Sequence, residues 1–92
     1  MTYKLVFTKN AYTDIERLRK SGDKKTLEKL DNLLTELRQH PRSGTGKPKM
    51  LSGNKMGTWS RRLTDKHRLR YIINDHLITV TVIGTYGHYE DK

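Results

Sequence analysis

The chain has 92 residues, of which 33% are hydrophobic and 32% charged, so we expect one domain, residues 1–92, with a modest core. Its 19 Lys and Arg against 10 Asp and Glu give a net charge of +9, which indicates a polyanionic partner. Cysteine is absent, which excludes disulfides, thiolate metal sites and cysteine nucleophiles. No apolar run is long enough for a membrane span, and the start of the chain does not resemble a signal peptide, so we expect a cytoplasmic protein.

The first half of the chain predicts a strand followed by two helices. Alternating apolar residues predict a strand over Tyr3–Phe7, and Thr8 or Asn10 is placed to cap the helix that follows. Ser21–Asp23 contains a glycine and predicts a break. Leucines at helical spacing then predict a longer helix that ends before Pro41. Two helices joined by so short a break indicate a helical hairpin.

The second half predicts a sheet. After a loop over residues 42–48, strand-like stretches follow at Thr58–Leu63, Arg68–Asn74 and Leu77–Thr85, with a further short strand at Lys49–Leu51. An N-terminal strand, a two-helix hairpin and then an antiparallel β-meander make an α+β fold, with the helices on one face of the sheet.

The basic residues are concentrated in one part of the chain. Residues 42–70 hold nine basic residues and one acidic residue, Asp65, which gives this segment a net charge of +8. The rest of the chain is nearly balanced. A charge excess that only kept the protein soluble would not have to be localised in this way.

Alternation along the predicted strands sorts these cations by face. Trp59, Arg61 and Leu63 share one face, opposite Ser60 and Arg62. In the next strand Arg68 and Arg70 share a face. One sheet face is therefore expected to present guanidinium groups, whose paired N–H donors suit phosphate. The side chains that we expect to contact RNA are Lys47, Arg61, Arg62, Arg70 and Tyr86.

RNA cleavage without a metal or other cofactor requires a base for the 2′-hydroxyl, cations for the phosphorane and an acid for the leaving 5′-oxygen. His67 and His88 titrate near neutral pH, and Tyr86 and Tyr89 are aromatic rings suited to stacking on a base. The same features also fit a protein that only binds: a cationic segment is more often a partner surface, and a histidine beside a turn is often only polar surface.

Several motifs carry a family resemblance. The segment 44–51 contains G-T-G-K-P, and the segment 57–71 contains W-S-R-R-L-T followed by H-R-L-R-Y; a His88-Tyr89 pair lies near the end. These motifs, in this order, resemble the Txe/YoeB toxins of the RelE/ParE superfamily. The resemblance implies a RelE/ParE-like, microbial-RNase-like fold and a ribosome-dependent messenger RNA endonuclease. It also implies neutralisation by a co-expressed antitoxin of the YefM/Phd type.

The resemblance also implies roles for individual residues. Arg68 matches the position that stabilises phosphate charge, His88 the general acid and Tyr89 a stacking or orienting neighbour. His67 precedes the arginine in the motif and is expected to support it. One position departs from the family, which usually has a glutamate as the proposed general base where this chain has Lys49. This lysine is expected either to act as a base, which requires neighbouring cations to depress its pKa, or to stabilise the phosphorane while His67 or a ribosomal group assists deprotonation. The third alternative is that the chain is catalytically weak.

Two other classes of function remain open at this stage. A gyrase poison shares the fold but has no evident use for the terminal His88-Tyr89 pair. A basic module that only binds RNA or an antitoxin needs no acid. In each case a segment of charge +8 predicts an acidic partner chain that folds on binding. The sequence does not decide whether the protein forms a homodimer.

Overall fold

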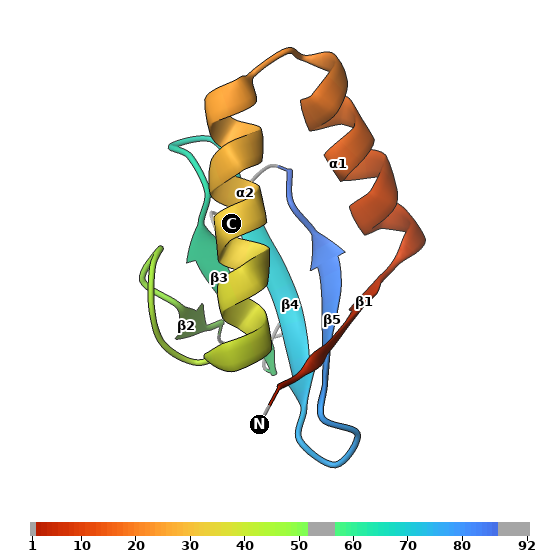
Figure 1. Cartoon of the computed structure of the whole chain (residues 1–92), viewed down its shortest axis with the longest axis vertical. Helices are drawn as coiled ribbons and strands as arrows, with labels where there is room; N and C mark the ends of the chain where they lie inside the picture. Colours follow the sequence, from red (N-terminus) through yellow and green to blue (C-terminus); the bar gives the residue numbers. More distant parts are fainter. Residues whose placement is uncertain (1, 52–56, 87–92) are drawn as a thin grey trace.

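The computed structural model describes residues 2–51 and 57–86 and contains two helices and a five-stranded sheet. The elements in chain order are β1 (Lys4–Phe7), α1 (Lys9–Lys20), α2 (Lys24–Gln39), β2 (Lys49–Met50), β3 (Thr58–Arg62), β4 (Arg68–Asn74) and β5 (Thr79–Gly84). The strand order across the sheet is β1-β5-β4-β3-β2. Both helices lie over the same face of the sheet, with α2 in front of β3 and β4 (Figure 1), so the predicted α+β fold is confirmed.

The helices begin and end where the sequence predicts, because short polar side chains cap them. Thr8, and not Asn10, caps α1: its hydroxyl oxygen accepts a 3.1 Å hydrogen bond from the Ala11 amide. Asp23 caps α2 by accepting from the Thr26 amide at 3.1 Å and from the Thr26 hydroxyl at 2.6 Å. These two bonds lower the pKa of Asp23. Gly22, between the helices, has φ of +79°, which glycine adopts without steric cost.

The core lies between the helices and the sheet. The leucine stripe of α2 supplies Leu30, Leu33 and Leu37, and the strands supply Leu69 and Val82, all at most 3% exposed. Burial of this many aliphatic side chains is the main driving force for the fold. None of the helices in residues 2–51 and 57–86 is long and apolar enough to cross a membrane.

The sheet differs from the predicted meander at one edge. Strands β2 to β5 are antiparallel neighbours as predicted, but β1 joins the edge of β5 in parallel. The two helices that cross between β1 and the meander make a parallel pairing accessible. The strand bounds differ slightly from prediction, since β1 starts at Lys4 and β5 covers only Thr79–Gly84.

The register of β3 and β4 decides which cations share a face. Arg62 lies opposite Arg68, and Arg61 lies opposite Leu69. Because side chains alternate along a strand, Arg62 and Arg68 lie on one face while Arg61 lies on the other, beneath the helices with the buried Leu69. Only part of the predicted row of guanidinium groups therefore shares one face.

Candidate functional site

Four basic side chains surround a small cavity at the β2–β3–β4 end of the sheet. The cavity has a volume of about 210 Å³, and its described lining residues are Gly46, Lys47, Lys49, Arg62 and Arg68. Lys47 lies in the loop between α2 and β2, Lys49 starts β2, and the two arginines face each other across β3 and β4. No carboxylate is among the described residues that line this cavity, so it is suited to a phosphate group.

Arg68 is held in place from the sheet. Its Nε donates a 2.6 Å hydrogen bond to the hydroxyl of Ser60, which is 0% exposed. On the rim, Arg62 Nη1 is 3.9 Å from Asp65 Oδ1, with both side chains largely exposed. Such an exposed contact contributes little to stability, and Asp65 is not among the described residues that line the cavity.

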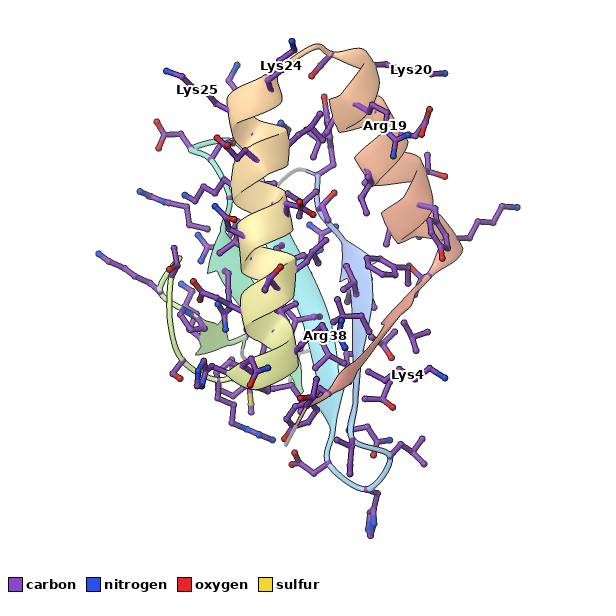
Figure 2. All side chains as sticks on the ribbon, in the orientation of Figure 1. Lys4, Arg19, Lys20, Lys24, Lys25 and Arg38 are labelled. Carbon is purple, nitrogen blue, oxygen red and sulfur yellow. The ribbon has the colours of Figure 1, made fainter. Side chains whose placement is uncertain are left out.

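The cations that Figure 2 labels do not line this cavity. Lys20, Lys24, Lys25 and Arg38 extend outward from α1 and α2, and Lys4 extends from β1 (Figure 2). None of them is among the described residues that line the cavity. The basic residues that gather around one hollow therefore come from the segment 42–70, as the charge distribution indicates.

Arg61 does not take part in this site, contrary to prediction. Its side chain is 0% exposed and forms an ion pair of 2.8 Å with Glu36. Alternation places it on the core face of β3, where its guanidinium donates hydrogen bonds to the Tyr71 hydroxyl and to Glu36. A guanidinium enclosed in this way has no access to RNA phosphate, so Arg61 is removed from the set of RNA contacts.

Arg70 is likewise buried, at 3% exposed, and does not serve as a surface contact for RNA. It lies opposite Gly84 on β5, where a Cβ atom would overlap its guanidinium. The missing side chain leaves room for the arginine, which donates a 3.3 Å hydrogen bond to the Tyr86 carbonyl. Sequence alternation predicted which face of the strand carries Arg70. It did not reveal that Gly84, on the neighbouring strand, leaves room for the arginine to be buried.

His67 and Tyr86 lie together in a second hollow. Their ring centroids are 4.1 Å apart, and the Arg17 guanidinium lies 4.6 Å from the Tyr86 ring centroid. This hollow, of about 500 Å³, also includes residues of the α1–α2 turn and shares no described lining residue with the cationic cavity. Although His67 and Arg68 are adjacent in sequence, they line different hollows, and the Tyr86 ring predicted to stack on a base is engaged by protein side chains.

The structure thus groups some predicted site residues and separates others. Lys47, Lys49, Arg62 and Arg68 come together. His88 and Tyr89, which were predicted as general acid and its neighbour, lie outside the described residues. Within residues 2–51 and 57–86 no group of three or more His, Asp or Glu side chains is placed to hold a metal ion.

Sequence reasoning missed the residues that support the cavity. Ser60 was placed on the same face as Arg62, but nothing in the sequence shows that it would hold Arg68. Gly46 lines the cavity with φ of +87°, and a Cβ atom there would lie 2.9 Å from the Arg62 carbonyl oxygen. Its position in the G-T-G-K-P motif, directly before Lys47, was the available signal.

Comparison with known proteins matches almost the whole chain to one family. A family profile described as the YoeB-like toxin of bacterial type II toxin–antitoxin systems matches residues 7–89. The toxin YoeB of Mycobacterium bovis is 42% identical over 69 residues, which cover 75% of this chain and 79% of that protein.

Solved structures share the fold. A YoeB/ParE toxin from Agrobacterium tumefaciens superposes with a TM-score of 0.87 at 35% identity, covering 94% of this chain and 99% of that one. YoeB from Staphylococcus aureus, solved as a dimer and in complex with YefM, superposes with TM-scores of 0.81 and 0.80 at 30% and 28% identity. Each comparison covers 97% of this chain and 100% of the other. By sequence and by fold, this chain belongs to the YoeB-like toxins of bacterial type II toxin–antitoxin systems.

Proposed function

We propose that this toxin is an endoribonuclease that cleaves messenger RNA in the ribosomal A site. The observation that carries the proposal is the cavity whose described lining contains two lysines and two arginines but no carboxylate. Phosphoryl transfer is catalysed mainly by positioning and by stabilisation of charge that develops on the phosphate oxygens. Side-chain cations at this cavity supply that charge, so the reaction requires no metal ion.

The reaction proposed is attack by a 2′-hydroxyl on the adjacent phosphorus. The bond from the 2′-oxygen to phosphorus forms, the bond to the 5′-oxygen breaks, and a 2′,3′-cyclic phosphate and a free 5′-hydroxyl result. A base takes the 2′-hydroxyl proton, and an acid gives a proton to the leaving oxygen. We assign Arg68 to the phosphorane charge, Lys49 to the base or to the same charge, and His88 to the acid, with Tyr89 beside it.

The surrounding residues have lesser roles. Among the described residues that line the cavity, we assign Lys47 and Arg62 to neighbouring phosphates of the RNA. We assign His67 a supporting role that acts through Tyr86, because the two rings are in contact. Phosphate contacts of this kind give affinity and position without sequence preference, so the ribosome would supply the choice of the codon.

The experiment compares programmed ribosomes with isolated messenger RNA, using primer extension to find new 5′ ends. We expect cleavage at the A-site codon and much less cleavage of the isolated RNA. His88→Ala is expected to lower cleavage about 10²–10⁴-fold. Arg68→Ala tests the cavity, and Arg38→Ala is its matched control, since Arg38 extends from α2 (Figure 2).

The alternatives predict different results. Tight ribosome binding without new 5′ ends would identify a protein that only binds, and inhibition of gyrase supercoiling would identify a gyrase poison. Equal cleavage by the Arg68→Ala and Arg38→Ala variants would show that the cationic cavity is not the catalytic site.

The partner proposed for this toxin is an acidic antitoxin of the YefM/Phd type. YoeB from Staphylococcus aureus has been solved in complex with YefM, and the +8 segment of this chain suits a chain of opposite charge. We expect antitoxin binding to weaken as the salt concentration increases. The bound antitoxin is expected to abolish cleavage. A homodimer, the form in which the Staphylococcus aureus toxin has also been solved, is tested by sedimentation of the toxin alone.

A further inference from the structure

Arg61 is a buried arginine in which every donor has an acceptor. Arginine has five N–H donors, and Arg61 makes five hydrogen bonds within the chain while 0% exposed. The acceptors are the Tyr71 hydroxyl at 3.2 Å, Glu36 Oε1 at 2.8 Å, and the carbonyl oxygens of Thr45 at 3.3 Å, Ser43 at 2.7 Å and His40. Three of these acceptors are backbone atoms of the loop that follows α2.

Glu36 holds the same loop from the helix. Its Oε1 also accepts from the Thr45 amide at 2.9 Å, and its Oε2 accepts from the Thr45 hydroxyl at 2.6 Å. Tyr71 completes the set by donating from its hydroxyl to the Pro41 carbonyl at 2.8 Å. Burial is the main reason that the pKa of Tyr71 is raised, so the phenol keeps the proton that it donates. We call Glu36, Thr45, Arg61 and Tyr71 the loop clamp.

The loop held by this clamp leads directly into the cationic cavity. The next residue after Thr45 is Gly46, whose carbonyl accepts a 2.8 Å hydrogen bond from the Arg62 amide. Gly46 and Lys47 both line the cavity with Arg62 and Arg68, and Lys47 has an unusual φ of +51°. Strand β3 thus places Arg61 in the clamp on one face and Arg62 at the cavity on the other.

Stability alone is a weak reason for such an arrangement. Desolvation of a buried ion pair offsets much of its attraction, and apolar side chains of similar size often stabilise a core as well. Apolar side chains cannot form the directed hydrogen bonds that Arg61 makes to three carbonyl groups of the loop and that Tyr71 makes to a fourth. A clamp of this kind fixes one loop conformation, and a functional site requires that its supporting residues be fixed in this way.

We infer that Arg61 and Glu36 are positioning residues, which hold loop 40–46 so that Lys47 and Lys49 lie beside Arg62 and Arg68. Neither residue lines the cavity among the described residues, so they act through the loop and not on the substrate. The catalytic consequence of this inference rests on the proposed endoribonuclease function. The geometric part, that the clamp fixes the loop, stands independently of it.

The test uses Thr45, whose hydroxyl reaches Glu36 from an exposed position, so that its variants are expected to fold. Thr45→Val removes the hydroxyl at nearly constant size, and Thr45→Ser retains it. Thr35→Val is the control, because the Thr35 hydroxyl donates to the Asp31 carbonyl on exposed α2. We expect Thr45→Val to lower kcat about tenfold with KM within about twofold, and Thr45→Ser and Thr35→Val to match the wild type. Arg61→Lys, if folded, should lower kcat about 10²-fold.

A second readout does not depend on activity. Amide hydrogen exchange of Thr45 and Arg62 reports the two hydrogen bonds that tie the loop to Glu36 and to β3. We expect exchange at these amides to be faster in Thr45→Val and unchanged at Val82, in β5. Wild-type exchange in Thr45→Val would overturn the geometric part of the inference, and wild-type kcat would overturn its catalytic part. If the wild type cleaves nothing, the proposed function fails, while the exchange result still decides whether the clamp fixes the loop.

Discussion

The Nε of Arg68 donates a 2.6 Å hydrogen bond to the hydroxyl of Ser60 across the β3–β4 pair. Nε is the guanidinium nitrogen nearest to the strand, so this bond sets the plane in which the two terminal nitrogens lie. Ser60 is 0% exposed, so water does not compete for its hydroxyl. The arginine proposed to stabilise the phosphorane is thus oriented by a buried residue that does not itself line the cavity.

This relationship predicts that Ser60→Ala impairs catalysis in a protein that still folds. Loss of one hydrogen bond to a charged group costs about 1.5–3 kcal/mol in stability, and a guanidinium that is no longer held stabilises the transition state less well. We expect about a tenfold lower kcat on programmed ribosomes. Ser43→Ala is the control, because Ser43 contributes its carbonyl and its side chain is exposed. Wild-type kcat in Ser60→Ala would show that Arg68 needs no orientation from the sheet.

Lys49→Glu tests whether the cavity uses a lysine in place of a carboxylate. The change removes one of four cations and adds a negative charge beside the other three, so we expect phosphate binding to weaken and cleavage to fall about 10²-fold. Lys49→Gln separates the two effects, since it removes the cation without adding an anion. Faster cleavage by Lys49→Glu than by the wild type would instead identify a carboxylate base as the group that this site lacks.

The fold was predictable because its signals are local. The leucine stripe of α2 and the caps Thr8 and Asp23 act within a few residues of the chain, and such signals are readable from one sequence. The parallel pairing of β1 with β5 joins residues more than 70 positions apart. No local pattern encodes a pairing of this kind, so it was not predicted.

The site was less predictable, because burial of a charge depends on partners distant in sequence. Arg61 and Arg62 are neighbours of the same residue type, yet Arg61 is buried by Glu36, 25 positions away, while Arg62 lines the cavity. Alternation separated the two but did not reveal which face lies under the helices. The burial of Arg70 was unpredictable for the same reason, because Gly84 lies opposite Arg70 only in the folded sheet.

Gly46→Ala tests the close approach of the loop to β3. Gly22 and Gly46 have φ of +79° and +87°, so alanine costs about 1–2 kcal/mol at each from the backbone alone. A Cβ at Gly46 would also lie 2.9 Å from the Arg62 carbonyl oxygen, whereas a Cβ at Gly22 would meet no atom of the described residues within 4 Å, apart from its chain neighbours. We expect Gly46→Ala to lower the free energy of unfolding by about 1–3 kcal/mol more than Gly22→Ala. Urea titration measures both variants, and equal losses would contradict the close approach.

The loop clamp also predicts a pH dependence of stability. Hydrogen bonds from Thr45, and then from Arg61, hold the pKa of Glu36 below its ordinary value of 4.5. Because the folded pKa is the lower one, the stabilisation is fully present above pH 4.5 and is lost as the pH falls through the folded pKa. Protonation would leave the buried Arg61 without its counter-ion, as Glu36→Gln does at every pH.

We therefore expect Glu36→Gln to lower the free energy of unfolding by about 3 kcal/mol at pH 7, and this difference from the wild type to shrink below pH 4.5. Asp23 and Asp75 also have lowered pKa values, so acid destabilises both proteins, and only the difference between them isolates Glu36. Urea unfolding of the two proteins at several pH values between 7 and 3 measures this difference. A difference that stays constant down to pH 3 would mean that Glu36 holds the loop equally well when protonated, and that the hydroxyl and amide of Thr45 matter more than the charge.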